Sequence, residues 1–154
     1  MISVSICEQD FDVGQHYQAV CEAAPQAGAV VFFVGLVRDL YGDGDDDERV
    51  SHIELQHYAG MTEQLCEEIC EQAQQRFELD AVRVVHRVGE LHAGDQIVFV
   101  AAAARHRRAA FDGAQFVMDY LKTNATLWKK EVGTRGERWI GMKQTDQKAT
   151  QRWQ

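Results

Sequence analysis

QIVFVAAAARHRRAAFDGAQFVMDYLKTN, residues 96–124, contains the two patterns on which the fold prediction depends. Residues 96–104 are almost entirely apolar, which is typical of a strand that is buried on both faces. From residue 107 to residue 123 the apolar side chains recur at helical spacing. The buried face of this helix is predicted to carry Phe111, Ala114, Met118 and Leu121. The segment therefore predicts a buried strand followed directly by an amphipathic helix.

Further strands and helices are predicted on both sides of this segment. The strands are expected at 2–7, 28–38, 50–57 and 81–88, the helices at 12–23 and 61–77, and a hairpin at 127–141 that turns at 133–136. The connection at 89–95 is rich in turn residues, and the polar tail is compatible with a further helix.

The run GAVVFFVGLVR, residues 28–38, is predicted to be a strand that is buried on both faces. Gly35 interrupts the run and indicates a bulge or a close approach of another backbone segment. Because 28–38 and 50–57 are successive strands, we expect them to pair antiparallel. The predicted class is α+β, with helices packed on a mostly antiparallel sheet.

Length and composition favour a single domain. The chain has 154 residues, of which 45% are hydrophobic and 26% charged, as is common in globular proteins. The first residues have no basic start and no long apolar core, and no apolar run reaches the length of a membrane span. We therefore expect a cytoplasmic protein, in which the four cysteines are free thiols and not disulfides.

The charge of the chain is unevenly distributed. The net charge is −8, which argues against a general nucleic-acid-binding function. Residues 105–138 nevertheless carry eight basic and four acidic side chains, so this segment is +4 and the remainder is −12. A basic island in an acidic protein is typical of a local anion site. On charge alone, an ordinary solvated helix face and hairpin explain the island equally well.

Three clusters could carry chemistry. Arg38 follows a buried strand, where its guanidinium could hold an anion or pair with the acidic stretch at 39–48. Residues 105–108, RHRR, precede a predicted helix, whose N-terminus favours anions. The third cluster is Lys122 with Lys129 and Lys130, which follow Trp128 and can meet Lys122 only through the fold. Lys122 lies at the edge of the apolar helix face, where partial desolvation would make it usable as a base or nucleophile. Alternatively, Lys122 only complements the dipole of the helix that it ends.

Other kinds of site are disfavoured by the sequence. Cys66 and Cys70 share a helix face, but the absence of Cys-x-x-Cys and of a paired histidine cluster argues against zinc. The acidic stretch at 39–48 lacks the glutamate offset of a calcium loop and is predicted to be an exposed loop. No nucleophile elbow, phosphate-binding loop or dinucleotide fingerprint occurs. His52, His57 and His86 alternate within strands and are interpreted as packing or surface residues.

The longest distinctive segments resemble a known family. These are GAVVFFVGLVR, LQHYAGMTE, the run from His86 to Glu131 that includes HRVGELHAGD and FVMDYLKTNATLWKKE, and ERW. Together they resemble the large, catalytic subunit of molybdopterin synthase over nearly the whole chain. The resemblance implies an α/β hammerhead fold with a small additional β part, which agrees with the α+β class.

The resemblance also implies an activity and partners. The family converts cyclic pyranopterin monophosphate into molybdopterin as a sulfurtransferase of molybdenum cofactor biosynthesis. The sulfur arrives as a thiocarboxylate on the C-terminal Gly-Gly of a small ubiquitin-like partner subunit. Two large subunits form a homodimer with a small subunit at each end, which makes a heterotetramer. Neither a cofactor, a metal, nucleic acid nor a membrane is expected.

Residue by residue, the resemblance assigns the catalytic roles to Lys122 and Lys129. Lys122 is the first choice for a covalent or acid–base role at the carbonyl of the partner's tail, and Lys129 would assist proton transfer or hold the substrate. The implied substrate-binding residues are Leu36, Val37, Arg38, His106, Arg107, Lys122, Lys129, Lys130 and Glu131, and the implied pocket-lining residues are Phe33, Met118 and Lys143.

Two positions depart from the family pattern. Leu36 stands where lysine is frequent, and Lys143 stands where arginine is frequent. A lysine cannot reproduce the bidentate grip of a guanidinium, which weakens the anion contact expected there.

Two other functions remain open at this point. One is a binding module that docks a ubiquitin-like tail without chemistry, and the other is a small structural domain whose basic hairpin pairs with an acidic partner. Lys122 and Lys129 discriminate between them and an enzyme, because a docking module would not need both.

Overall fold

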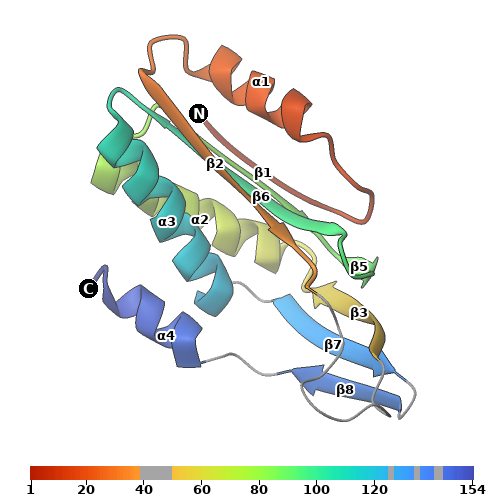
Figure 1. Cartoon of the computed structure of the whole chain (residues 1–154). Helices are drawn as coiled ribbons and strands as arrows, with labels where there is room; N and C mark the ends of the chain where they lie inside the picture. The colour runs from red at the N-terminus through yellow and green to blue at the C-terminus, as the bar shows by residue number, and fades with distance from the viewer. Residues whose placement is uncertain (39–49, 125–126, 134–135, 141–143) are drawn as a thin grey trace.

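The computed structural model describes residues 1–38, 50–124, 127–133, 136–140 and 144–154 (Figure 1). The elements follow in the order β1 Ile2–Cys7, α1 Val13–Ala23, β2 Ala29–Leu36, β3 Val50–His57, α2 Met61–Phe77, β4 Ala81–Arg87, β5 Gly89–Leu91, β6 Gln96–Ala104, α3 Arg107–Asn124, β7 Leu127–Gly133, β8 Gly136–Ile140 and α4 Gln144–Gln151. Four helices and two four-stranded sheets therefore make up the described part of the chain.

The first sheet is the centre of the fold and has the strand order β1-β4-β6-β2. Only β1 and β4 are parallel in it, because β6 runs antiparallel to both β4 and β2. α1 covers one face of this sheet, and α2 and α3 cover the other (Figure 1). The result is a three-layer sandwich of helix, sheet and paired helices.

β6 shows how the sequence builds these layers. Val98, Val100 and Ala102 belong to the core beneath α2 and α3, whereas the alternate residues Phe99 and Ala101 belong to the core beneath α1. Successive side chains of a strand leave opposite faces, so a strand covered on both sides must be apolar throughout. The prediction of a doubly buried strand at 96–104 is confirmed.

The second sheet has the strand order β5-β3-β7-β8 and lies beyond the end of the first sheet (Figure 1). Its pairs are all antiparallel. A small core of Val37, Ile53, Leu55, Val88 and Leu91 packs where the two sheets meet. Figure 1 shows that the second sheet lies next to the C-terminal end of α3.

The α+β class with mostly antiparallel strands is confirmed by the two sheets and by structural neighbours described below. The helices at 61–77 and 107–124 and the hairpin at 127–140 lie where the sequence predicts them. At the start of α1, the Asp12 carboxylate caps the helix by accepting a hydrogen bond of 2.9 Å from the Gln15 backbone N–H. The bulge predicted at Gly35 occurs between Gly35 and Leu36.

Three expectations are wrong. β2 is the edge strand of the first sheet rather than a doubly buried one, and Phe32 and Phe33 are 44% and 45% exposed. β2 does not pair with β3, because the two strands belong to different sheets. Phe111, predicted on the buried face of its helix, is 60% exposed. The apolar side chains of β2 and α3 thus do not all enter the core, and some line the hollow described below.

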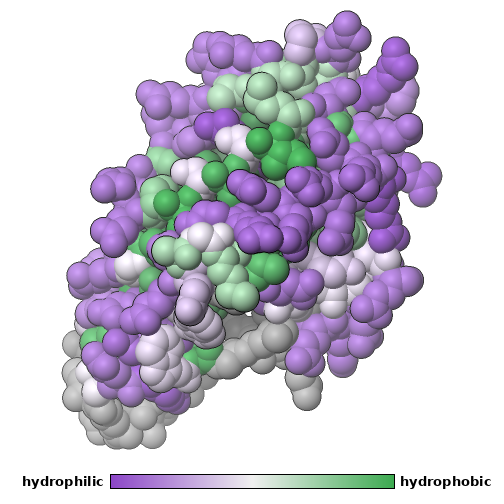
Figure 2. Space-filling model, turned by 180° about the vertical axis from the view of Figure 1, so that it is seen from behind, coloured by the Kyte–Doolittle hydropathy of each residue, from purple (hydrophilic) through white to green (hydrophobic). Residues whose placement is uncertain are grey.

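The structure adds a strand that the sequence does not reveal. β5 is only three residues long and pairs with β3 inside the connection expected to be a turn. Seen from behind, the surface is mainly hydrophilic, with apolar side chains gathered in an oblique band (Figure 2). None of the described helices combines the length and the apolar character that crossing a membrane requires. The acidic stretch at 39–48 lies outside the described residues.

Candidate active site

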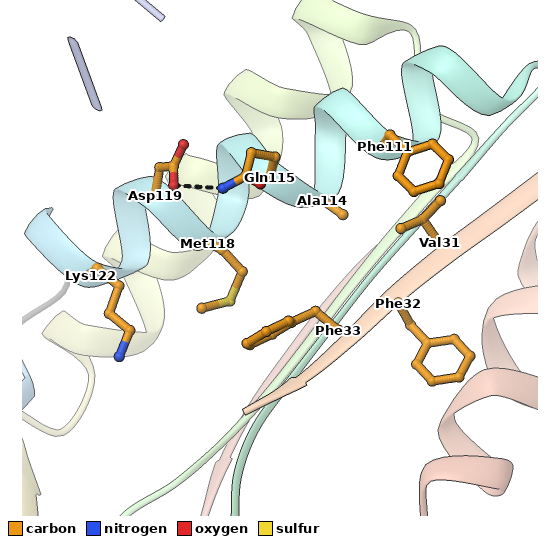
Figure 3. Close-up of a pocket in the computed structure, with 9 residues that line it drawn as sticks. All are labelled: Val31, Phe32, Phe33, Phe111, Ala114, Gln115, Met118, Asp119 and Lys122. Atoms are coloured by element: carbon orange, nitrogen blue, oxygen red, sulfur yellow. Dashed lines mark hydrogen bonds between the residues drawn. The ribbon is translucent and has the colours of Figure 1, made fainter. Parts of the chain in front are cut away.

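A hollow of about 390 Å³ opens between the edge strand β2 and the helix α3. Figure 3 shows Met118 and Lys122 projecting from the same side of α3 toward Phe33 of β2. Its lining residues are Val31, Phe32, Phe33, Phe111, Ala114, Gln115, Met118, Asp119 and Lys122. The lining is mostly apolar and has one cation, so the hollow can hold an apolar or extended group that ends in an anion.

Lys122 is positioned by the last turn of α3, which also carries the buried Leu121. Its side chain is exposed at the margin of the hollow, so the partial desolvation expected from the sequence is not seen. Within the described part of the chain, Lys122 makes no ion pair. An ammonium group without a carboxylate partner beside an apolar surface favours the binding of an anion.

Gly35 makes room beside the hollow. A Cβ atom there would lie 2.8 Å from Val98 Cγ1, 3.2 Å from Phe33 Cε1 and 3.3 Å from Ile97 Cγ2. Contacts this short would force the neighbouring side chains to move, so only glycine leaves Phe33 where it is.

The chain that follows Gly35 carries three of the predicted binding residues. Leu36 is 56% exposed. Val37 is buried in the small core between the sheets, and its backbone forms hydrogen bonds with Gly94 and Asp95. Arg38 is exposed at the end of the described segment. Its guanidinium is therefore accessible to an anion near the second sheet.

Lys129 and Lys130 lie on opposite faces of the second sheet. Lys129 is opposite Leu55 in the neighbouring strand and shares its face, which is the face that meets the core between the sheets. Lys130 is opposite Glu54 and points away. Lys129 therefore lies on the face of the second sheet that meets the core between the sheets, and Lys130 lies on the other face.

The charge of Lys130 is already satisfied. Its Nζ lies 3.1 Å from a Glu54 oxygen and 3.3 Å from a Glu137 oxygen, and it also lies over the Trp139 ring. The hydrogen bonds to Glu54 and Glu137 raise the pKa of Lys130, and the hydrogen bond with Lys130 lowers the pKa of Glu54. Glu131 is paired with Arg138 at 3.0 Å.

His106 and Arg107 are not brought to Lys122 by this fold. Both are exposed at the N-terminal end of α3, and Lys122 lies at its C-terminal end. Fifteen residues of α-helix separate Arg107 from Lys122, which corresponds to about 22 Å. Within one chain these residues cannot contact the same small molecule. Lys143 lies outside the described residues.

His86, interpreted from the sequence as a packing or surface residue, is a packing residue. His86 is on the β4 face that carries Val82 and Val84 beneath α2 and α3, and it is only 9% exposed. Its Nδ1 lies 2.8 Å from the Arg87 carbonyl oxygen. Burial, with the positive charges of Lys122 and His57, lowers the pKa of His86 to about 4, although the Arg87 hydrogen bond opposes the shift. The only feature of the sequence that indicates the burial of His86 is its place in the alternating pattern of a strand.

Sequence reasoning missed two polar residues of α3. Gln115 and the buried Asp119 line the hollow and are joined by a hydrogen bond of 2.8 Å (Figure 3). Their i, i+4 spacing on a helix is the signal that could have paired them.

The cysteines have the character of core residues. Cys66 and Cys70 are fully buried, and burial raises the pKa of Cys66 to about 11 and raises that of Cys70 as well. Among the residues with described positions, no cluster of three or more His, Cys, Asp or Glu side chains is arranged to hold a metal ion.

Comparison with known proteins places this geometry in a family. The family described as MoaE protein matches residues 6–124. The chain belongs to the MoaE family. It is 50% identical to the molybdopterin synthase catalytic subunit of Vibrio cholerae serotype O1, over 98% of this chain and 97% of that protein. The resemblance noted from the sequence, and with it the expectation of an enzyme, is confirmed.

Solved structures agree with this assignment. The molybdopterin biosynthesis MoaE protein from Burkholderia ambifaria MC40-6 is 45% identical and superposes with a TM-score of 0.85, covering 99% of this chain and 98% of that one. A protein–protein complex of subunits 1 and 2 of molybdopterin-converting factor from Helicobacter pylori 26695 has a TM-score of 0.71 over 89% of each chain. At 19% identity this second likeness supports the MoaE fold alone.

Proposed function

We propose that this MoaE-family chain converts cyclic pyranopterin monophosphate into molybdopterin in the cytoplasm. The sulfur would come from the C-terminal thiocarboxylate of a small ubiquitin-like partner subunit. The observation that carries the proposal is Lys122, a cation with no ion pair in the described structure, at the margin of an apolar hollow. Family membership supplies the reaction, and the hollow supplies a place for an extended tail that ends in an anion.

The chemistry requires one group that acts at the tail carbonyl. The thiocarboxylate sulfur attacks an electrophilic carbon of the pterin side chain and forms a C–S bond. A C–O bond at the same carbon breaks and its oxygen leaves with the electron pair, so that the tail becomes a thioester of the substrate. Water, or first the amine of Lys122, then attacks the acyl carbon and the acyl C–S bond breaks. Sulfur remains on the pterin as a thiolate, and hydrolysis returns the tail as a carboxylate.

The two lysines would divide this work. Lys122 stabilises the developing oxyanion or attacks the carbonyl, and both alternatives need its Nζ beside the tail. Lys129, on the inner face of the second sheet, would transfer a proton or hold the pterin. Arg38 would bind the phosphate. Because Lys122 is exposed in the single chain, the tail itself would have to cover it and exclude water.

His106 and Arg107 would reach this site only from a second copy of the chain. About 22 Å of helix separates them from Lys122, so their proposed contact with the substrate implies a homodimer. A small subunit at each end would then complete a heterotetramer. We leave Lys130 out of the proposed pocket, because Glu54 and Glu137 hold it on the opposite face.

The test is a reconstituted reaction. The chain is mixed with a thiocarboxylated small subunit and cyclic pyranopterin monophosphate, and molybdopterin is measured. We expect product from the wild type and from Lys148→Ala, an exposed lysine on α4. Binding of the small subunit without any product would instead identify a docking module.

A further inference from the structure

The carboxylate of Asp119 is held at both oxygens by neutral donors. The Trp153 indole N–H donates to Oδ2 at 2.8 Å, and the Gln115 side-chain amide donates to Oδ1 at 2.8 Å. Asp119 is only 6% exposed. Within the described residues it makes no ion pair. A buried carboxylate is thus satisfied without a cation.

Lys122, the lysine proposed to act in catalysis, is one helical turn away. Asp119 and Lys122 are at positions i and i+3 of α3 and both line the hollow. An acid that precedes a base at this spacing forms an ion pair readily on a helix. Figure 3 shows the opposite arrangement, in which the Asp119 carboxylate is turned toward Gln115 and away from the Lys122 amine.

The donor from the C-terminal tail is itself firmly placed. The Trp153 ring packs edge-on against Phe77 and Phe116, with ring centroids 5.5 Å apart in each pair. The Arg76 guanidinium lies over the same three rings and donates to the Trp153 carbonyl oxygen at 2.7 Å. The end of the chain is therefore fixed on α2 and α3, where its indole N–H reaches Asp119.

We propose that Trp153 and Gln115 are positioning residues that hold the Asp119 carboxylate away from Lys122 and so keep the charge of Lys122 available for the anionic tail. This inference rests on the proposed role of Lys122 and adds a reason for the docked C-terminus. A carboxylate released from either donor would rotate toward the amine and neutralise it. We call Trp153 and Gln115 together the clamp of Asp119. The clamp therefore acts on catalysis through Lys122 without contacting the substrate.

The direct test measures the reactivity of Lys122 without any substrate. The full chain is treated briefly with a small N-hydroxysuccinimide ester, and acylation of Lys122 is quantified by mass spectrometry relative to Lys148 in the same sample. Trp153→Phe keeps an aromatic ring but removes the N–H donor. We expect it to slow acylation of Lys122 by about two- to fivefold, the range of a half-exposed ion pair.

A double variant separates the clamp from a merely structural role. In Trp153→Phe/Asp119→Asn the released side chain carries no charge, so the rate at Lys122 should return to that of the wild type. If the tail only stabilises α3, the Asp119→Asn change would remove a second hydrogen-bonding partner. The rate of acylation at Lys122 would then not recover. Trp139→Phe, at an exposed tryptophan on β8, is the matched control and should change nothing.

Gln115→Met tests the same idea without touching the tail. Gln115→Met frees Oδ1 of Asp119, and the slower acylation of Lys122 should likewise be reversed by Asp119→Asn. If Trp153→Phe does not fold, Gln115→Met alone tests whether the donors hold Asp119 away from Lys122. In the reconstituted reaction, kcat/KM should fall and recover in parallel with acylation. Unchanged acylation in both single variants, or no recovery with Asp119→Asn, would overturn the clamp. Absence of product from the wild type would overturn the proposed function and leave the acylation result standing.

Discussion

Lys129 and Lys130 are neighbours in the sequence, but their side chains leave opposite faces of the second sheet. Lys129 is opposite the buried Leu55, whereas Lys130 is opposite Glu54, with which it forms an ion pair of 3.1 Å. The period of two in a strand thus gives two adjacent cations different roles. One faces the proposed pocket, and the other serves the fold.

The two lysines should therefore respond differently to removal of their charge. Lys129→Met should lower kcat by about 100-fold or more, as loss of a proton-transferring group does. Lys130→Met should lower the thermal midpoint, because Glu54 and Glu137 lose their cation, and retain most of the activity. Thermal unfolding and steady-state kinetics of both variants check this. Loss of activity in Lys130→Met, with activity retained in Lys129→Met, would show that Lys130 belongs to the pocket.

His86 should make stability depend on pH. Its pKa falls from the ordinary value of 6.5 to about 4 on folding, so the unfolded chain takes up a proton first as the pH decreases. The contribution of His86 to the free energy of unfolding is complete above about pH 6.5 and is lost as the pH falls from 6.5 to about 4. It amounts to about 3 kcal/mol. Unfolding by urea across this range measures it.

A variant isolates the contribution of His86. In His86→Gln the decrease in stability between pH 6.5 and 4 should become shallower by about that amount. A smaller dependence should persist, since burial also lowers the pKa of His16. His106→Gln, at an exposed residue just before α3, is the control and should leave the curve unchanged. A His86→Gln curve parallel to that of the wild type would show that His86 is not the group responsible.

Gly35 should be sensitive even to alanine. A Cβ atom there would press on Val98 and Phe33, so we expect Gly35→Ala to cost about 1–3 kcal/mol of stability. Displacing Phe33 should also narrow the hollow and raise the KM for the thiocarboxylated small subunit. Thermal unfolding and a titration with that subunit measure both effects. Unchanged values would mean that Phe33 has room to move.

The order of elements could be predicted from the sequence because it depends on local patterns. Period-3.6 spacing places the helix at 61–77, and glycines place the turn of the hairpin at 133–136. The edge position of β2 could not be predicted. Apolar side chains that line an open hollow give the same sequence pattern as side chains that are buried in a core. Likewise, three residues of β5 are too few to show any periodicity.

The candidate site was only partly predictable for a related reason. Family resemblance identifies Lys122 and Lys129, but a sequence does not state that Lys122 and Arg107 lie at opposite ends of one helix and cannot meet in one chain. The contact between Trp153 and Asp119 joins residues 34 positions apart, and only the packing of the tail on α3 creates it.

Because Arg107 and Lys122 are too far apart within one chain, activity should be recoverable between two defective chains. His106→Ala/Arg107→Ala and Lys122→Ala should each be inactive alone. When the two are mixed and allowed to exchange subunits, one site per dimer would combine an intact Lys122 with intact His106 and Arg107. We expect up to about one quarter of wild-type activity from a random mixture, since half of the dimers are mixed and each has one intact site. A mixture as inactive as its components would place the whole site in one chain.

The proposed reaction depends on the action of Lys122 on the carbonyl of a bound tail. Its most direct test is a single-turnover reaction with the thiocarboxylated small subunit and cyclic pyranopterin monophosphate, comparing the wild type with Lys122→Ala. We expect the variant to bind the small subunit with similar affinity but to transfer sulfur about 100-fold more slowly or worse. A Lys122→Ala rate within threefold of the wild-type rate would contradict the account.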